Sequence, residues 1–330
     1  MRELTFVDVC SGAGGLALGM EQAGLSPRLL LDNDPVACEI LRLNRPDWPI
    51  DMADLRDFDP AENSEVYDVD VLLAGVPRFR SAATVQRSSD DEAVEMFRAA
   101  MYLAPAVRPR ALVIENVPAM VESEELASVR ELAHAELEHL GYRLYWDVLN
   151  AMDFAVPQDR RVGLLVALRE ESADRFRMPE ATVREPLTVG EALLESMASR
   201  GWPGARRWAA HADTVAPTLV GGSTNRGGAD FGPRGSQRRW QRMGVYTKSY
   251  GDVPPGPDFV WDPDLGPAGL VPVTVEQAAL VQGFPAEWRF TGGKTKRYGL
   301  IAQACPPPLA GALGRAIESA LRRTPRPSAG

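Results

Sequence analysis

The sequence predicts an α/β fold with a mostly parallel sheet covered by helices, together with a smaller irregular domain. Three observations predict it. The chain has 330 residues, enough for one large domain and a small one. Over about the first 185 residues, short apolar runs alternate with segments whose apolar residues repeat at helical spacing, which is typical of βαβ units. Residues 200–270 are instead rich in Gly, Pro and Arg, which favours a binding domain built from loops.

Each expected strand is a short apolar run, and each expected helix repeats apolar residues at helical spacing. The first helix stops at Gly24, and Pro35 stands at a favourable first-turn position of the second. The expected strands are 4–10, 27–34, 68–75, 110–117, 142–151 and 160–169. The expected helices are 15–24, 35–44, 92–107, 274–285 and 306–323, and a disordered tail is expected over 324–330.

Composition argues against a membrane protein, a disulfide-rich domain and a metal protein. The chain has 45% hydrophobic and 25% charged residues, as ordinary soluble proteins have. It has no run of about 18 apolar residues, and the first strand begins too early for a signal peptide. Cys10, Cys38 and Cys305 are too few and too scattered for a disulfide framework or a zinc site. We therefore expect a cytoplasmic protein without a metal.

Charge is unevenly distributed along the chain. The formal net charge is −9, which by itself disfavours a nucleic-acid partner. Residues 201–250, however, contain many basic side chains and only two acidic ones, Asp213 and Asp230. The basic residues of this window are Arg206, Arg207, Arg226, Arg234, Arg238, Arg239, Arg242 and Lys248. Such a local basic patch is typical of a nucleic-acid interface, although a solvated surface loop can have the same composition.

A glycine-rich loop links the first expected strand to the first expected helix. Gly12, Gly14 and Gly15 let the backbone turn tightly and approach a ligand, and the following helix offers free N–H groups. Asp32 ends the second strand, where a carboxylate can bind the hydroxyls of a ribose. Asp54 could accept a hydrogen bond from an adenine amino group. Together these residues favour an adenosine-containing ligand, either NAD or S-adenosylmethionine, over a turn that binds nothing.

Seven segments, taken in order, resemble the motifs of the cytosine-5 DNA methyltransferases. They are 6–24 (FVDVCSGAGGLALGMEQAG), 29–47 (LLLDNDPVACEILRLNRPD), 53–58 (ADLRDF), 114–120 (IENVPAM), 156–167 (VPQDRRVGLLVA), 274–288 (TVEQAALVQGFPAEW) and 298–317 (YGLIAQACPPPLAGALGRAI). The resemblance implies a doubly wound catalytic domain of the S-adenosylmethionine-dependent methyltransferase type and a small irregular target-recognition domain. It also implies S-adenosylmethionine as cofactor, S-adenosylhomocysteine as product, and a target cytosine flipped out of duplex DNA. The expected bounds are 1–185 for the catalytic domain, 186–272 for the recognition domain and 273–323 for a return to the catalytic domain.

The resemblance also assigns roles to residues. In this family a Cys thiolate adds to carbon 6 of cytosine, which makes carbon 5 nucleophilic. Glu115, from the Glu-Asn-Val motif, would hold ring nitrogen 3 and the exocyclic amine, and Arg160, from the Gln-x-Arg-x-Arg motif, would steady the base carbonyl. The expected cofactor-binding residues are Asp8, Cys10, Gly12, Gly14, Gly15, Asp32, Asn33, Asp54, Leu55, Pro77 and Gln303.

Arg78 occupies the place of the catalytic nucleophile. Pro77 matches the proline of the family's Pro-Cys loop, so Arg78 stands where the cysteine should be. A guanidinium stays protonated and has no lone pair to give, so it cannot add to carbon 6. Softer departures from the family pattern lie at residues 90–97, at Val162 and at Gln303. We therefore expect standard methyl transfer to be lost or severely weakened.

The basic segment 216–245 lies where the family has its recognition domain. Its glycines would let a loop follow a DNA groove, and its expected DNA contacts are Arg234, Arg238, Arg239 and Arg242. Arg78 and Arg80 could pair with a DNA phosphate without chemistry. The family suggests a restriction–modification protein, expected to be a monomer, that could act beside a restriction endonuclease. Two alternatives stay open: a non-catalytic DNA-binding or regulatory protein on the same scaffold, and an RNA or nucleotide methyltransferase.

Overall fold

The fold comes from a computed structural model, which describes residues 2–79, 87–221 and 230–322. Arg80, Arg226 and the expected tail at 324–330 lie outside the described residues, and of 87–91 only the backbone is described. Contacts divide the chain into two compact units. The first consists of Met1–Leu149, Val162–Glu180 and Leu309–Gly330, and the second of Asn150–Arg161 and Ala181–Pro308.

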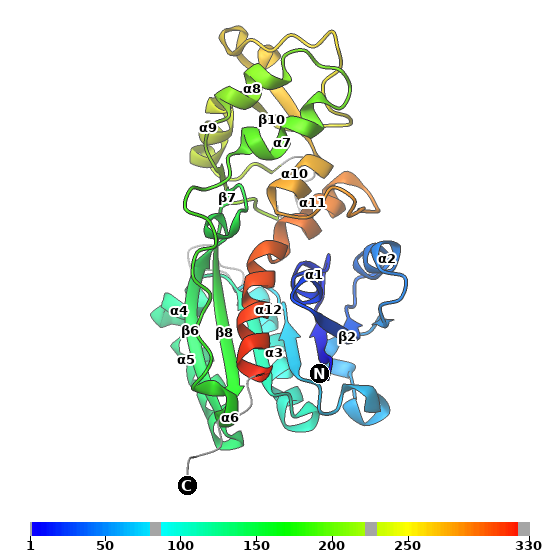
Figure 1. Cartoon of the computed structure of the whole chain (residues 1–330), viewed down its shortest axis with the longest axis vertical. Coiled ribbons are helices and arrows are strands. Elements are labelled where there is room, and N and C mark those ends of the chain that lie inside the picture. The colour runs from blue at the N-terminus through cyan, green and yellow to red at the C-terminus, as the bar shows by residue number, and fades with distance from the viewer. Residues whose placement is uncertain (1, 80–86, 222–229, 323–330) are drawn as a thin grey trace. The chain divides into compact units, whose positions relative to one another are not determined.

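The first unit is built on a seven-stranded sheet, counted over the described residues, with the order β3-β2-β1-β4-β5-β8-β6 (Figure 1). The strands are β1 (Leu4–Val9), β2 (Leu25–Leu31), β3 (Ile50–Asp51), β4 (Val71–Ala74), β5 (Ala111–Asn116), β6 (Tyr142–Asn150) and β8 (Arg161–Arg169). The pairs β1–β2, β1–β4, β2–β3 and β4–β5 are parallel, and β8 is antiparallel to β5. The predicted doubly wound, mostly parallel sheet is thus confirmed.

The strand order places two loops at one edge of this sheet. The chain leaves β1 toward β2 and β3 and then returns to β4 on the opposite side of β1. Doubly wound folds bind ligands outside the carboxyl ends of the strands at such a reversal. A Cβ atom on Gly75, just after β4, would lie only 3.1 Å from the carbonyl oxygen of Cys10, just after β1. The glycine-rich loop and the loop that carries Arg78 are therefore neighbours.

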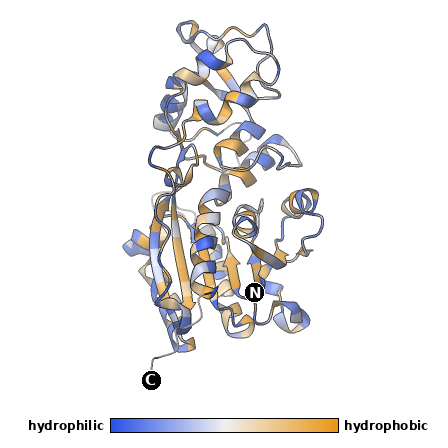
Figure 2. Cartoon of the chain, in the orientation of Figure 1, coloured by the Kyte–Doolittle hydropathy of each residue, from blue (hydrophilic) through white to orange (hydrophobic). Residues whose placement is uncertain are grey.

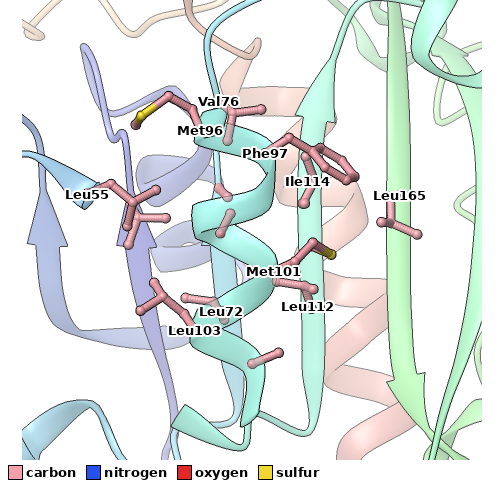
Figure 3. Packing of buried hydrophobic residues seen from close by; sticks show 14 of the residues in the cluster. Leu55, Leu72, Val76, Met96, Phe97, Met101, Leu103, Leu112, Ile114 and Leu165 are labelled. Carbon is pink, nitrogen blue, oxygen red and sulfur yellow. The ribbon is translucent and has the colours of Figure 1, made fainter. Parts of the chain in front are cut away.

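One face of the sheet packs against α3 (Arg87–Val107) and α5 (Ala127–Leu137). Every second residue of the central strands faces these helices, because side chains alternate along a strand. The buried strand residues on this face include Val7, Val9, Leu72, Ala74, Leu112, Ile114 and Leu165. Figure 3 shows α3 in front of the strands, with Phe97 and Met101 directed toward Ile114 and Leu112. Each fully buried side chain of this size contributes about 1.5–3 kcal/mol.

The opposite face is covered by α1 (Gly15–Gln22) and α12 (Pro307–Arg322), the latter visible behind the strands in Figure 3. These two helices approach very closely, since a Cβ atom on Gly19 would lie 2.4 Å from the Cβ of Ala310. Leu309, Leu313 and Ile317 of α12 are fully buried. The central strands are accordingly mostly apolar and appear largely orange in Figure 2. The remaining helices of the unit are α2 (Pro35–Asn44), α4 (Ala119–Glu122) and α6 (Glu170–Ala173).

The second unit is mainly helical, with two short parallel strand pairs, β7–β9 and β10–β11. Its helices are α7 (Val189–Ala198), α8 (Ala205–His211), α9 (Arg234–Arg242), α10 (Val275–Val281) and α11 (Lys294–Gln303). Its strands are β7 (Gln158–Asp159), β9 (Ala216–Pro217), β10 (Val245–Gly251) and β11 (Val271–Thr274). Capping boxes begin α7 and α10, where Thr188 pairs with Glu191 and Thr274 with Gln277.

The structure differs from the sequence-based expectation in this second unit. The segment 216–245 was expected to be a loop, but its residues 234–242 form α9. Trp240 on this helix and Met243 just after it are buried. Contacts place residues 150–161 and 273–308 in the second compact unit. The expected bounds of the catalytic and recognition domains stay a prediction. Among the described residues, no helix is both long and apolar enough to cross a membrane.

Candidate functional site

The glycine-rich loop after β1 is held in a tight turn. Cys10, Gly12 and Gly14 have φ angles of 58°, 53° and 84°, in the left-handed region that glycine adopts without strain. Gly12 donates its backbone N–H to Asp32 Oδ2 at 2.7 Å, and Asp34 donates its own to Asp32 Oδ1 at 2.8 Å. The Asp32 carboxylate therefore lies at the loop, at the end of β2, where the sequence places a ribose-binding acid.

Asp8 is the second-to-last residue of strand β1, just before this loop. Its carboxyl group is buried and has no hydrogen-bond partner among the described residues. Burial raises its pKa well above the ordinary value, and the neighbouring Asp32 carboxylate raises it further. A buried acceptor of this kind is costly unless it is protonated or receives a hydrogen bond from a ligand. The corner thus suits a ligand that brings a cationic donor.

Asn33, Asp54 and Arg56 form a second acidic corner beside α2. Asp54 caps the 3-10 turn Leu55–Asp57 and accepts hydrogen bonds from both Arg56 and the amide of Asn33. The Arg56 guanidinium grips the Asp54 carboxylate through Nε and Nη2 at 2.8 and 2.7 Å. This pairing holds the pKa of Asp54 far below its ordinary value. Leu55 is buried at the same turn.

The loop after β4 is fixed by the side chain of Asn116, at the end of β5. Asn116 Nδ2 donates to the carbonyl oxygens of Val76 and Pro77 at 3.2 and 3.1 Å. Its Oδ1 accepts from the backbone N–H of Phe79 at 3.0 Å and from that of Val117 at 2.9 Å. These bonds bracket Arg78, so the position at which the family has its nucleophile is clamped from both sides.

Glu115 lies beside this clamp and is 5% exposed. Burial raises its pKa from 4.5 to about 7, and the Arg78 guanidinium opposes the increase. The carboxyl group can therefore hold or release a proton near neutral pH. The Arg78 guanidinium is thus close enough to Glu115 to favour the charged form of its carboxyl group.

A second buried polar cluster lies within the other unit, around Arg160. Its guanidinium donates to the carbonyl oxygens of Leu219 and Ala304 at 3.3 Å each, and its Nε has no partner. Across the described residues no carboxylate forms a salt bridge with it, although it is 2% exposed. Gln158 donates to Gln282, which itself donates to the same Ala304 oxygen at 2.6 Å. A buried cation with a free N–H suits an additional oxygen acceptor.

The four arginines predicted to contact DNA all lie on α9 and are exposed, while Trp240 on the same helix is buried. They are Arg234, Arg238, Arg239 and Arg242. Arg239 Nη1 lies 3.4 Å from Oδ2 of Asp159, and Asp159 directly precedes Arg160 in the sequence. Gln303 ends α11 in the same unit and lies 3.2 Å from where a Cβ on Gly221 would be. Arg239 thus pairs with an acid, whereas the other three form no salt bridge within residues 2–79, 92–221 and 230–322.

The family model described as C-5 cytosine-specific DNA methylase matches residues 4–319 of the chain. The chain belongs to this family. Type II methyltransferase M.NaeI of Lentzea aerocolonigenes is 39% identical over 322 residues, which cover 97% of this chain and 76% of that protein. Type II methyltransferase M.NgoMIV of Neisseria gonorrhoeae is 37% identical over 327 residues, covering 97% and 99%.

Solved structures share the fold of this cytosine-5 methylase chain. The Dnmt2 methyltransferase of S. pombe has a TM-score of 0.65 at 16% identity and covers 98% of this chain and 100% of its own. The Entamoeba histolytica methyltransferase EhMeth has a TM-score of 0.67 at 13% identity, with coverage of 98% and 100%. The sequence identified the family but did not reveal the hydrogen bonds of Asn116 and Gln282, whose partners are distant in sequence.

The three cysteines, Cys10, Cys38 and Cys305, are free thiols that are buried or partly buried. Burial raises the pKa of the Cys10 thiol far above its ordinary value, with the Asp32 carboxylate adding to the effect. Burial likewise raises the pKa of Cys38 to about 11, and Cys305 is buried in the second unit. The thiolate is the reactive form, so Cys10 and Cys38 are inert near neutral pH.

The shifted pKa of Glu115 predicts a pH-dependent stability. Its folded-state pKa of about 7 lies above its ordinary value of 4.5, so the folded protein binds a proton that the unfolded chain releases between these values. This contribution is fully present below pH 4.5 and is lost as the pH rises through about 7, a change of roughly 3 kcal/mol. Urea unfolding at pH 5 and pH 7.5 should show a smaller fall for Glu115→Gln than for the parent. Equal falls in both proteins would contradict the assignment.

Proposed function

We propose that this cytosine-5 methylase homologue binds S-adenosylmethionine and duplex DNA but has lost, or nearly lost, standard transfer to carbon 5. The position of Arg78 carries the proposal. It follows Pro77 in a loop that Asn116 clamps beside the buried Glu115. The family reaction needs an electron pair for carbon 6 at this place, and a guanidinium has none.

The residues at the carboxyl ends of β1 and β2 support the cofactor assignment. The buried, unpartnered Asp8 carboxyl could accept a hydrogen bond from the cofactor's amino group, and Asp32 could hold the ribose hydroxyls. The glycine-rich loop lets the backbone approach the ligand. When bound, S-adenosylmethionine supplies the methyl group of the family reaction; the residues here bind and orient it.

The base-binding roles rest on Glu115 and Arg160. When protonated, Glu115 can donate its O–H to ring nitrogen 3 of a flipped cytosine, and its other oxygen can accept from the exocyclic amine. Arg160 has a buried N–H left over for a base carbonyl. Both groups are present although residue 78 is not a cysteine. We therefore propose that the protein still recognises cytosine although it no longer transfers a methyl group to it. A restriction endonuclease partner, a monomeric state and a cytoplasmic location stay predictions.

The α9 arginines are the proposed contacts to the DNA backbone. Removing one phosphate contact should lower affinity and reduce the salt slope of binding by about 1. Arg238→Ala should show both effects in a fluorescence-anisotropy titration of a mixed-sequence duplex at several salt concentrations. Arg239→Ala should show less, because Asp159 already offsets its charge.

The exposed Arg28 of β2 supplies a matched control. Arg28→Ala removes the same charge from the first unit and should leave affinity within about twofold of the parent. If the triple variant of Arg234, Arg238 and Arg242 to Ala bound duplex DNA as tightly as the parent at every salt concentration, α9 would not be the DNA-binding element. Loss of binding by Arg28→Ala to the same degree would point to non-specific charge effects instead.

A further inference from the structure

The Asp54 carboxylate, the proposed acceptor for the adenine amino group, is already saturated by the protein. Oδ1 accepts from the backbone N–H and Nε of Arg56 at 2.9 and 2.8 Å. Oδ2 accepts from Arg56 Nη2 at 2.7 Å and from Asn33 Nδ2 at 3.0 Å. A carboxylate offers about four lone-pair sites, so none is left for a ligand.

Three of these four bonds come from a single residue, Arg56. Its side chain is 47% exposed, so a bond to Asp54 can break at modest cost. The Asn33 amide supplies only one of the four bonds, and the backbone N–H of Arg56 belongs to the cap of the 3-10 turn. The two guanidinium bonds are therefore the ones that a ligand can displace.

A second partner for the displaced guanidinium stands on α3. Arg56 Nη1 lies 4.0 Å from Glu95 Oε2, and the Glu95 carboxylate is 62% exposed. Both residues line a cavity of about 470 Å³ together with Leu55, Phe58, Arg98 and Tyr102. The guanidinium therefore has room and a charge partner on the side away from Asp54.

We propose that Arg56 is a gating residue of the adenine subsite, which must exchange Asp54 for Glu95 before the adenine amino group can bind. The inference rests on the proposed cofactor site. It makes Arg56 a competitor of the ligand rather than a contact to it. The Arg56 guanidinium then pairs with Asp54 before the ligand binds and with Glu95 when the ligand is bound.

Calorimetric titration with S-adenosylhomocysteine tests the gate. Arg56→Ala should bind the ligand about three- to tenfold more tightly than the parent, because no ion pair must be broken. Glu95→Gln should bind about two- to threefold more weakly, because the displaced guanidinium loses its second partner. Arg98→Ala, which removes a charge from the same cavity without touching Asp54, should match the parent within about twofold.

The outcomes separate this inference from the proposed function. If the parent binds and Arg56→Ala binds more weakly, Arg56 contacts the ligand and the gate is wrong, while the cofactor site stands. If neither the parent nor any variant gives heat or a thermal shift, the cofactor site itself is wrong and the gate falls with it. Arg56→Lys, which keeps the charge but cannot grip Asp54 with two nitrogens, guards against a misfolded alanine variant and should bind more tightly than the parent.

Discussion

Arg78→Cys will transfer labelled methyl groups from S-adenosylmethionine to mixed-sequence duplex DNA, whereas the parent will transfer none above background. The loop that carries residue 78 is already fixed by three hydrogen bonds with the Asn116 side chain, so a thiol would be delivered to a preformed position. Glu115 beside it can hold the base in the protonation state that the reaction needs. We expect a gain of at least about a hundredfold, well below the roughly 10⁶-fold that removing a nucleophile costs a serine protease.

Arg78→Ala is the matched control for this experiment. It removes the same guanidinium without adding a thiol, so it should stay as inactive as the parent. Transfer by the parent would mean that another nucleophile or another target atom is used, against the mechanism proposed here. Failure of Arg78→Cys in a protein that still binds DNA and cofactor would place the block at residues 90–97, Val162 or Gln303 instead.

Asn116→Asp will destabilise the protein by about 3 kcal/mol or more and will abolish any transfer gained by Arg78→Cys. The substitution is isosteric, and the Oδ1 bonds to Phe79 and Val117 can persist. The second oxygen, however, would face the carbonyl oxygens of Val76 and Pro77 where the amide now donates. Asn116 is 2% exposed, so the new charge would be buried among acceptors. Urea unfolding of the first unit measures the loss.

Asn63→Asp provides the comparison for that loss. Asn63 is half-buried, and its amide donates to the carbonyl oxygen of Asp59 in an exposed hydrogen bond, so this variant should lie within about 0.5 kcal/mol of the parent. A similar loss in both variants would show that the added charge, and not the clamp, is responsible. An Arg78→Cys/Asn116→Asp protein that still transfers methyl groups would show that the loop does not need Asn116.

The first half of the fold could be predicted because its strands are buried on both faces. The runs 71–74 and 111–114 are wholly apolar, and the helices between the strands repeat apolar residues at regular spacing. The glycine-rich loop and the glutamate of the Glu-Asn-Val segment could be proposed as site residues because each directly follows or ends an apolar strand, which the sequence alone reveals.

Helix α9 of the second unit was harder to predict because most of its side chains are not buried. Helix α9 is buried through Trp240 and supported by Met243, and Gly235 with the flanking Gly232–Pro233 conceals its periodicity. The contacts of Asn116 and Arg56 could not be predicted at all. Asn116 bonds to backbone atoms 37 to 40 positions away, and no spacing rule reports such a bond. The hydrogen bonds that fill the acceptor sites of Asp54 depend on the rotamer of Arg56, and the periodicity of a sequence does not predict a rotamer.

The contact between α1 and α12 sets the order in which the chain can fold during synthesis. Gly19 of the first helix meets Ala310 near the end of the chain, and Arg110 and Arg175 donate to backbone oxygens of Leu321 and Ala320. During synthesis, the part of this sheet face that α12 covers therefore stays uncovered until Pro307–Arg322 has been made. A transcript ending before residue 309 would release a product with that face exposed, and such a product is expected to aggregate or to be degraded rather than to bind its ligands.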